Sequence, residues 1–431
     1  MARRRSPALG SPVVEYDLLR GENLRNPYQL YARLRDEAPV HWHPGLSGWV
    51  VTRYEDVVAA IADKRLSADR FEPYLERLDE RGRDDSDEPD GDPQLRTFYR
   101  NLQLWISFAD PPDHTRLRAL IGKALPPRVL RDVMTEASGI ADGLLDVCAA
   151  KGEFDVIADY SYPLAVTVIT RLLGIPADDE GMFEQWSDDL TRYIGGSLVQ
   201  PDRRERAMRA LSDLGDYLRD AIAQRRREPG PDVVTSLITA QEGGTQLTDD
   251  EIVATCAMML FAGHGTTTNL IGNGLFALLG HPDQLDRLRS DGSLAGKAVE
   301  ELLRYDSPVQ MTIRIVREEM ELSGCRFRPG ERVFPVVASA NRDERRFADP
   351  DVLDIERPEN RHVSFGYGVH FCIGAPIARV EAPIGLTKLV ERFPRLAVVD
   401  EDELEWQPTV GFRALERLPV QAADERGGAG V

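Results

Sequence analysis

A run of 29 residues without Asp, Glu, Lys or Arg, from Ile252 to Gly280, constrains the fold of this chain most strongly. Thr248 and Glu251 precede the run with the T-x-x-E spacing of a capping box, which predicts that a helix begins there. A helix that continues to Gly280 is about 50 Å long, enough to cross a whole domain. The run also meets the length test for a membrane span. Its middle, however, reads HGTTTN followed by GNG, and these polar groups and glycines favour a buried helix that lines a cavity.

The rest of the pattern predicts a mainly α protein with small β-sheets. Helical periodicity dominates from residue 113 to about residue 305. Helices around a strand pair are expected within residues 24–64, and later strands at 320–327, 331–341, 396–400 and 416–421. The 431 residues can bury a large core, and no repeat or linker interrupts them. We therefore expect a single domain over residues 13–421, flexible segments at 1–12 and 422–431, and an acidic mobile loop at 79–93.

The charge and the cysteine content narrow the class of protein. A net charge of −19 argues against wholesale binding to nucleic acid or to an anionic membrane. None of the four cysteines forms a CxxC pair, so disulfide and zinc frameworks are weakly supported and a reducing cytoplasm is the expected location. The first residues contain no apolar stretch, so no signal peptide or membrane anchor is expected.

The segment HVSFGYGVHFCIGAPIAR, residues 362–379, sets one thiol, Cys372, among glycines and aromatic residues. A helix is predicted directly after it, and the free N–H groups of a helix N-terminus stabilise a thiolate. The glycines at 366, 368 and 374 permit backbone turns that direct further N–H groups at the sulfur, and the rings of Phe365 and Phe371 exclude water. The residues alone leave three interpretations open: a thiolate ligand to a metal cofactor, an inert buried cysteine, or a nucleophile with His370 or His362 as its base.

Five motifs, in order, resemble those of the cytochrome P-450 family, in particular its soluble bacterial members. The pattern F-G-x-G-x-H-x-C-x-G begins at Phe365 and contains Cys372. AGHGTTTN at 262–269 is similar to the oxygen-binding stretch of the family's central helix. EELLR supplies the E-x-x-R motif as Glu301 and Arg304. DPPDHTRLR at 110–118 and ANRDERRFADPDVLDIER at 340–357 match two further segments.

This resemblance implies the single-domain cytochrome P-450 fold, with the long central helix over a haem. It identifies Cys372 as the axial ligand of the iron of heme b, within a loop that includes Phe365, Gly366 and Gly374. Cationic or hydrogen-bonding partners for the haem propionates are expected at His114, Arg118, Arg314 and His370. Glu301 and Arg304 are expected to join Arg357 in a buried network that supports the fold.

The resemblance also assigns the oxygen side of the site, where this chain departs from the family. Thr266 matches the threonine that helps to deliver protons to dioxygen, with Ala262 and Gly263 beside it. The residue before the threonine is usually Asp or Glu in the family, but here it is Gly265. Protons can instead come through water with Thr267, Thr268 or His264, or from the substrate; otherwise Gly265 only enlarges the pocket.

The implied function is that of a monooxygenase that activates O2 with two electrons and oxidises an apolar small organic substrate, as in secondary metabolism. Ferredoxin and ferredoxin reductase are the expected electron donors, which an arginine-rich face can attract. Because of Gly265, oxidative coupling, desaturation or peroxide-driven oxidation are alternatives, and a non-catalytic haem sensor is an alternative from another class. The expected basic face consists of Arg116, Lys123, Arg128, Arg131 and Arg379, and the expected pocket of Leu104, Trp105, Leu260, Phe261, Val309, Met311 and Thr312.

Overall fold

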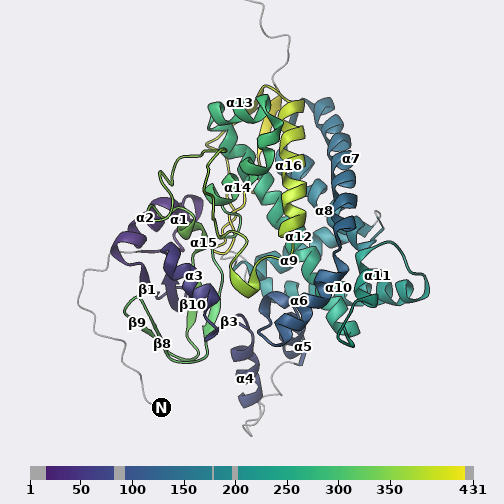
Figure 1. The fold of residues 1–431 in the computed structure, drawn as a ribbon, viewed down its shortest axis with the longest axis vertical. Coiled ribbons are helices and arrows are strands. Elements are labelled where there is room, and N and C mark those ends of the chain that lie inside the picture. Colours follow the sequence, from purple (N-terminus) through teal and green to yellow (C-terminus); the bar gives the residue numbers. More distant parts are fainter. Residues whose placement is uncertain (1–15, 82–92, 177–178, 197–201, 423–431) are drawn as a thin grey trace, which may run out of the picture.

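The computed structural model describes residues 16–81, 93–176, 179–196 and 202–422. Its helices gather on one side of the molecule and its main sheet on the other, with α1, α2 and α3 beside the sheet (Figure 1). These three helices span Gly21–Arg25, Tyr28–Glu37 and Tyr54–Ala62. The prediction of a mainly α fold with small sheets is thereby confirmed.

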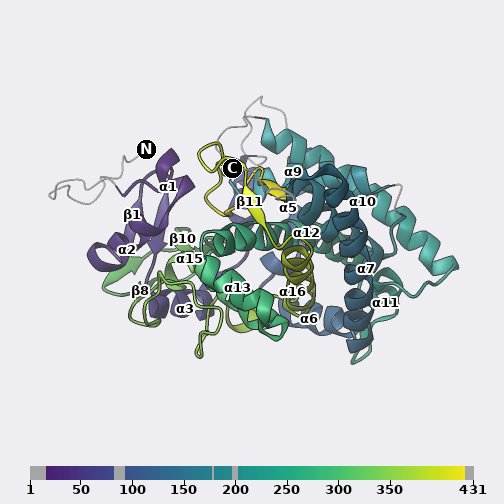
Figure 2. The ribbon, with the colours of Figure 1, turned by 90° about the horizontal axis from the view of Figure 1, so that it is seen from above.

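The charge-free run forms all of α12 after its first three residues; α12 spans Asp249–Leu279 and crosses the molecule (Figure 2). Its capping box is present: the Thr248 side chain accepts from the N–H of Glu251, and the Glu251 carboxylate accepts from the N–H of Thr248. Apolar side chains from several surrounding helices bury α12 in the largest hydrophobic cluster. Because it is buried on nearly all sides, its apolar residues show no single amphipathic stripe.

Most of the other helices pack around α12 or on one another. α16 (Ala375–Arg392) follows the cysteine loop and packs against α12, α7 (Pro127–Lys151) and α14 (Ala295–Tyr305). The remaining helices are α4 (Glu72–Arg81), α5 (Pro93–Gln103), α6 (Asp113–Ala124), α8 (Tyr162–Leu173), α9 (Glu180–Ile194), α10 (Arg203–Arg227), α11 (Val233–Thr239), α13 (Pro282–Ser290) and α15 (Val337–Ala340). Short helical segments occur at Ile106–Phe108, Val156–Ser161 and Gly368–His370.

The main sheet has five strands in the order β1-β2-β10-β7-β3. β1 (Val40–His43) and β2 (Gly48–Val51) form the expected antiparallel pair, and β10 (Arg332–Pro335) joins β2 in parallel. The sheet is completed by β7 (Arg314–Val316) and β3 (Leu66–Ser67). Smaller sheets contain β11 (Leu396–Val398), β12 (Pro419–Ala422) and β4 (Glu153–Asp155), then β5 (Gln241–Glu242) with β6 (Thr245–Gln246), and β8 (Met320–Leu322) with β9 (Cys325–Phe327).

Several boundaries differ from the sequence prediction. The strand expected over 331–341 ends at Pro335, and its second half forms α15. Of the expected acidic loop at 79–93, residues 79–81 belong to α4 and Pro93 to α5, and residues 82–92 lie outside the described part. The expected flexible segments at both termini also lie outside it, except Ala422, which ends β12.

One helical stretch of the described residues, Val156–Leu173, is apolar and long enough to cross a membrane by length and composition. The core helix of a soluble protein passes the same test, and 56% of this stretch is buried inside the fold. The stretch singled out from the sequence, in α12, is a different one, and most of its residues are buried.

Candidate functional site

The cysteine loop is held by its own backbone. The N–H of Cys372 donates to the carbonyl of Phe365 at 2.7 Å. Gly366 and Gly368 have φ angles of 75° and 66°, in the left-handed region that other residues enter at a cost. Gly374 does not serve the turn as expected, since its φ is −83° and it caps α16. The loop therefore needs two of its glycines for conformation and uses the third as a helix cap.

The sulfur of Cys372 lies at the N-terminus of α16, as the sequence predicted. Burial raises the pKa of the Cys372 thiol, while hydrogen bonds from the N–H groups of Gly374 and Ala375 and the charge of Arg118 lower it. These N–H groups favour the thiolate. Cys372 nevertheless remains accessible, because its side chain faces a cavity.

Neither histidine considered as a base for Cys372 is placed to act as one. His362 pairs through Nε2 with the Glu300 carboxylate at 3.1 Å. The ring of His370 lies against that of His114, with centroids 4.3 Å apart. Within the described residues, no hydrogen bond joins Cys372 to a histidine. The geometry therefore favours a ligand over a nucleophile or an inert cysteine.

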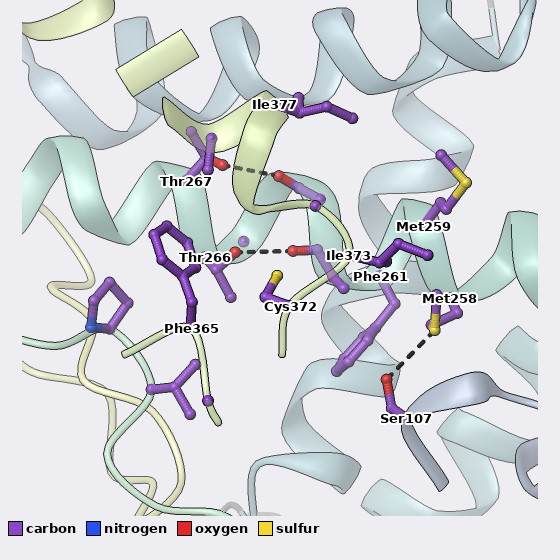
Figure 3. A pocket seen from close by; sticks show the side chains of 18 of the residues that line it. Ser107, Met258, Met259, Phe261, Thr266, Thr267, Phe365, Cys372, Ile373 and Ile377 are labelled. Atoms are coloured by element: carbon purple, nitrogen blue, oxygen red, sulfur yellow. Dashed lines mark hydrogen bonds between the residues drawn. The ribbon is translucent and has the colours of Figure 1, made fainter. Parts of the chain in front are cut away.

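The cavity has a volume of about 360 Å³ and lies between α12 and the cysteine loop (Figure 3). Its walls come from α6, α8, α9, α12, α14 and α16, and from residues 106–107, 125, 308–309, 312, 364–366, 370–374 and 412. Most of the side chains that line it are apolar, among them Ile169, Met258 and Phe261. A cavity of this size and lining is typical of a site for an organic molecule.

The oxygen-side residues predicted from the sequence all face this cavity. Ala262, Gly263, Gly265 and Thr266 line it from α12. The Thr266 hydroxyl donates to the Ala262 carbonyl one turn earlier, at 2.9 Å. A Cβ atom added at Gly265 meets no other atom within 4 Å, so the space beside this residue is open.

Of the three side chains considered as substitutes for the missing acid, only Thr267 lines the cavity. Its hydroxyl donates to the Gly263 carbonyl at 3.0 Å. His264 is buried, and its Nδ1 lies 2.7 Å from the Leu260 carbonyl. Burial lowers the pKa of His264, and the hydrogen bond to the Leu260 carbonyl opposes this only in part. Thr268 is buried too and lies near the Ser161 carbonyl.

Four basic side chains gather at one edge of the cavity. His114, Arg118 and His370 line it, and Arg314, from β7, is buried close to them. Burial and the nearby charge of Arg314 together lower the pKa of His370 to about 3. Burial likewise lowers the pKa of Arg314 to about 10. The Nδ1 atom of His114 is buried without a hydrogen-bond partner in the described part of the chain.

These donors fit the carboxylates of a haem. The edge offers two guanidinium groups and an imidazole atom that lacks a partner, while the cysteine sulfur faces the same cavity. Carboxylates accept charge-assisted hydrogen bonds from such groups. Arg118 has a second contact, since its Nη1 donates to the Phe371 carbonyl at 2.7 Å and so ties α6 to the cysteine loop.

The expected buried network is present. Arg304 donates twice to Glu301, at 2.8 Å each, and both side chains have no exposed surface. Arg357 adds contacts of 3.1 and 3.2 Å to the same carboxylate. Arg304 also donates to the carbonyls of Asn341, Pro350 and Val352. The network thus joins α14 to the segment that precedes the cysteine loop.

The expected substrate pocket is only partly correct. Phe261, Val309 and Thr312 line the cavity. Trp105 does not, because it is fully buried behind the wall and packs on Phe261 with ring centroids 5.3 Å apart. Met311 lines a separate, much smaller cavity near the N-terminal segment. Leu104 and Leu260 are also absent from the wall of the main cavity.

Sequence reasoning missed Glu381, which lines the cavity from α16. It is 2% exposed, and its Oε1 atom has no hydrogen-bond partner in the described residues. Burial raises the pKa of this carboxyl well above its usual value. In the sequence, Glu381 follows Ile377 by four residues and Ala378 by three, which places the three side chains on one face of the predicted helix. This spacing becomes informative only once it is known which face of the helix lines the cavity.

The predicted basic face is largely neutralised. Arg116 pairs with Glu251, Lys123 with Glu242, and Arg379 with Glu300. Arg128 and Arg131 are exposed near the N-terminus of α7. The five residues therefore do not form one uncompensated patch.

Comparison with known proteins agrees with this geometry. The sequence pattern of the cytochrome P450 family matches residues 82–413. Cytochrome P450 107B1 of Saccharopolyspora erythraea is 41% identical over 395 residues, which cover 91% of this chain and 94% of that protein. The structure of P450BioI in complex with an acyl carrier protein ligated to hexadec-9Z-enoic acid is similar, with a TM-score of 0.84, 34% identity and coverage of 94% and 99% of the two chains. The Bacillus subtilis bacillaene polyketide synthase cytochrome P450 PksS has a TM-score of 0.84, 32% identity and coverage of 95% and 100%.

Proposed function

The chain belongs to the cytochrome P450 family and is a cytochrome P450 monooxygenase, and we propose that it holds heme b through Cys372 and oxidises an apolar small organic substrate. One arrangement supports this proposal above all others. Cys372 and Thr266 face the same apolar cavity, and basic side chains edge it. When bound, the haem supplies the activation of O2 with two electrons from a redox partner.

The residues of the loop have separate tasks. The Cys372 sulfur is the proposed axial ligand, and the N–H groups of Gly374 and Ala375 stabilise its negative charge. Phe365 and Phe371, half-buried with ring centroids 6.1 Å apart, limit the access of water. His114, Arg118, Arg314 and His370 are the proposed partners of the propionates.

An apolar substrate is proposed because methionine, isoleucine and phenylalanine side chains dominate the wall above the cysteine. Ser107 and Thr312 offer polar contacts that can orient it. The likeness to a P450 of a polyketide synthase supports a substrate from secondary metabolism. The likeness to P450BioI, whose structure contains a carrier protein, adds a carrier-bound substrate as a possibility to test.

Ferredoxin and ferredoxin reductase are the proposed electron donors, in the cytoplasm. Tyr367 and Val369 are exposed on the cysteine loop, and Arg128 and Arg131 are exposed on α7. The other three residues of the predicted basic face, Arg116, Lys123 and Arg379, are paired with acids. We therefore propose that docking depends on apolar contact as well as on charge. The atypical reactions, namely coupling, desaturation and peroxide-driven oxidation, are the second candidate function, which the absence of an acid at Gly265 supports.

The reduced, CO-bound spectrum of the purified protein tests the proposal. Wild-type protein should show the red-shifted Soret band of a thiolate-ligated haem, and the Cys372→Ser variant should lose it. The Cys148→Ser variant is the matched control, because Cys148 is buried far along the chain from the loop. Protein that purifies without haem, or a band that survives in Cys372→Ser, contradicts the proposal. Turnover with redox proteins then separates an enzyme from a haem sensor.

A further inference from the structure

Two arginines near the cavity have no acidic partner. The guanidinium of Arg70, between β3 and α4, lies over the rings of Phe71 and Phe108, 5.3 and 4.7 Å from their centroids. Arg332, from β10, donates to the Tyr74 hydroxyl at 2.6 Å. Both arginines are half-buried, and within the described residues neither pairs with a carboxylate. Partly desolvated cations without a counter-ion cost folding free energy, and an anion that binds from outside the chain would offset this cost.

The acids that neighbour these arginines in the sequence have other partners. Asp69 accepts from an amide on α5 and Glu331 from an indole on β2, each at 2.7 Å. Burial and the charges of Arg332 and Arg314 together lower the pKa of Arg70 to about 10, so Arg70 is still a cation at neutral pH. Because Arg314 is assigned to the haem propionates, the other two cations remain without a counter-ion.

Three tyrosines from different helices meet beside these cations. The rings of Tyr74, on α4, and Tyr99, on α5, stack with centroids 5.3 Å apart, and the hydroxyl of Tyr193, on α9, donates to that of Tyr99 at 3.4 Å. Tyr74 and Tyr193 lie close enough to Arg70 to oppose the lowering of its pKa. Phenol hydroxyls donate to carboxylates, as guanidinium groups do. We call Arg70, Arg332, Tyr74 and Tyr193 the arginine–tyrosine cluster.

The arginine–tyrosine cluster borders the main cavity along two segments. Ser107 lines the cavity, and the next residue, Phe108, has the Arg70 guanidinium over its ring. On α9, Thr191 lines the cavity, and Tyr193 follows two residues later. An apolar molecule in the cavity is therefore one layer of side chains away from a group of cations and hydroxyls.

We propose that the arginine–tyrosine cluster binds the carboxylate of the substrate, whose apolar chain lies in the cavity. The substrate class is then that of long-chain organic acids, and this proposal narrows the proposed monooxygenase function, on which it rests. Arg70 and Arg332 supply the charge, while the Tyr74 hydroxyl accepts from Arg332 and keeps its own proton to donate. Fixing the carboxylate at one end of the chain also fixes which carbon lies beside Cys372.

Calorimetric titration of the purified holoprotein measures the preference for an acid. The probes are dodecanoic acid and hexadec-9Z-enoic acid, each compared with the primary alcohol of the same chain, which has the same apolar length without the charge. Wild type should bind each acid at least about tenfold more tightly than its alcohol at low salt, and high salt should reduce this ratio. If acid and alcohol bind equally, the protein itself neutralises the two cations and the proposal is wrong.

Substitution of the arginines locates the preference. In Arg70→Gln and in Arg332→Gln the acid should bind about tenfold more weakly, whereas the affinity for the alcohol should change by less than about twofold. Arg70→Lys keeps the charge and should keep part of the preference. Arg395→Gln is the matched control and should equal wild type, because Arg395 is exposed between α16 and β11. Equal losses for acid and alcohol would indicate a distorted cavity and overturn the proposal, as would a wild-type preference in both Gln variants.

The proposed function and this binding site fail in different measurements. The CO-bound spectrum is recorded for every variant, and wild-type protein without the red-shifted band contradicts the monooxygenase function. Protein that keeps the band but does not prefer the acid contradicts only the arginine–tyrosine cluster. Because Arg70 and Arg332 come from separate elements, a folding defect in one variant leaves the other variant to decide the question.

Discussion

Glu301 and Arg304 lie one helical turn apart on α14 and are joined by two hydrogen bonds of 2.8 Å, and neither side chain has exposed surface. At the surface such a pair would contribute little. Here it is buried, and Arg357 and the backbone satisfy its remaining donors and acceptors. The pair therefore stabilises the packing of α14 against the segment ahead of the cysteine loop and has no contact with the cavity.

Breaking this network should destabilise the protein severely. Arg304→Ala leaves the Glu301 carboxylate buried with only part of its partners, which we expect to cost about 3–5 kcal/mol in the free energy of unfolding. Urea denaturation measures the loss. Arg287→Gln is the control, since the Arg287–Glu356 pair is about half exposed and should cost at most about 1 kcal/mol. Equal losses in the two variants would contradict the buried-network interpretation.

Two glycines of α12 that lie two residues apart, Gly263 and Gly265, should respond differently to alanine. Gly265→Ala places its Cβ in open space and should stabilise the helix by up to about 1 kcal/mol. Gly263→Ala brings its Cβ to 3.0 Å from two atoms of Ile169, so this variant should be no more stable than wild type, or less stable. Thermal melting of the two variants measures the difference. A more stable Gly263→Ala than Gly265→Ala would show that the helix packs differently there.

Adding the missing acid should change catalysis rather than folding. Gly265→Glu introduces a carboxylate next to Thr266, and we expect a changed ratio of product to NADPH together with altered peroxide release. The melting temperature should stay close to that of Gly265→Ala. If NADPH use, peroxide and product yield all equal those of wild type, the acid gap has no bearing on the reaction.

The buried acid predicts a pH-dependent difference in stability. The folded-state pKa of Glu381 is raised above the unfolded value near 4.5, so its contribution is fully present below that pH and is lost as the pH rises. Glu381→Gln has no such loss. Its free energy of unfolding, relative to wild type, should therefore increase from pH 4.5 towards pH 8, as measured by urea denaturation at several pH values. A constant difference across this range would mean that the group titrates normally.

The cysteine loop should tolerate alanine at one glycine but not at another. Gly366→Ala forces a Cβ into φ 75°, which we expect to cost about 1–2 kcal/mol and to distort the loop that holds Cys372. Gly374→Ala keeps φ −83° and an ordinary 3.8 Å contact with the sulfur. The CO-bound Soret band should weaken in Gly366→Ala and persist in Gly374→Ala. Loss of the band in both would assign Gly374 a conformational role as well.

The sequence by itself determined the parts of this protein that depend on neighbouring residues. The charge-free run and its capping box determined α12, and the glycines and Cys372 determined a turn at the start of α16, because caps and turns arise from local hydrogen bonds and backbone angles. The five motifs also identified the cavity-facing residues of α12 and the network of Glu301 and Arg304, which the resemblance carried over by position.

Only the tertiary structure decided which side chains reach the cavity. Trp105 and Met311 are apolar and close in sequence to residues that line it, yet packing places them behind the wall and in a second cavity. Glu381 looks in the sequence like any acid on a helix, and only the packing of α16 buries it in the wall of the cavity. Burial depends on contacts between segments more than 100 residues apart, and local sequence does not encode these contacts.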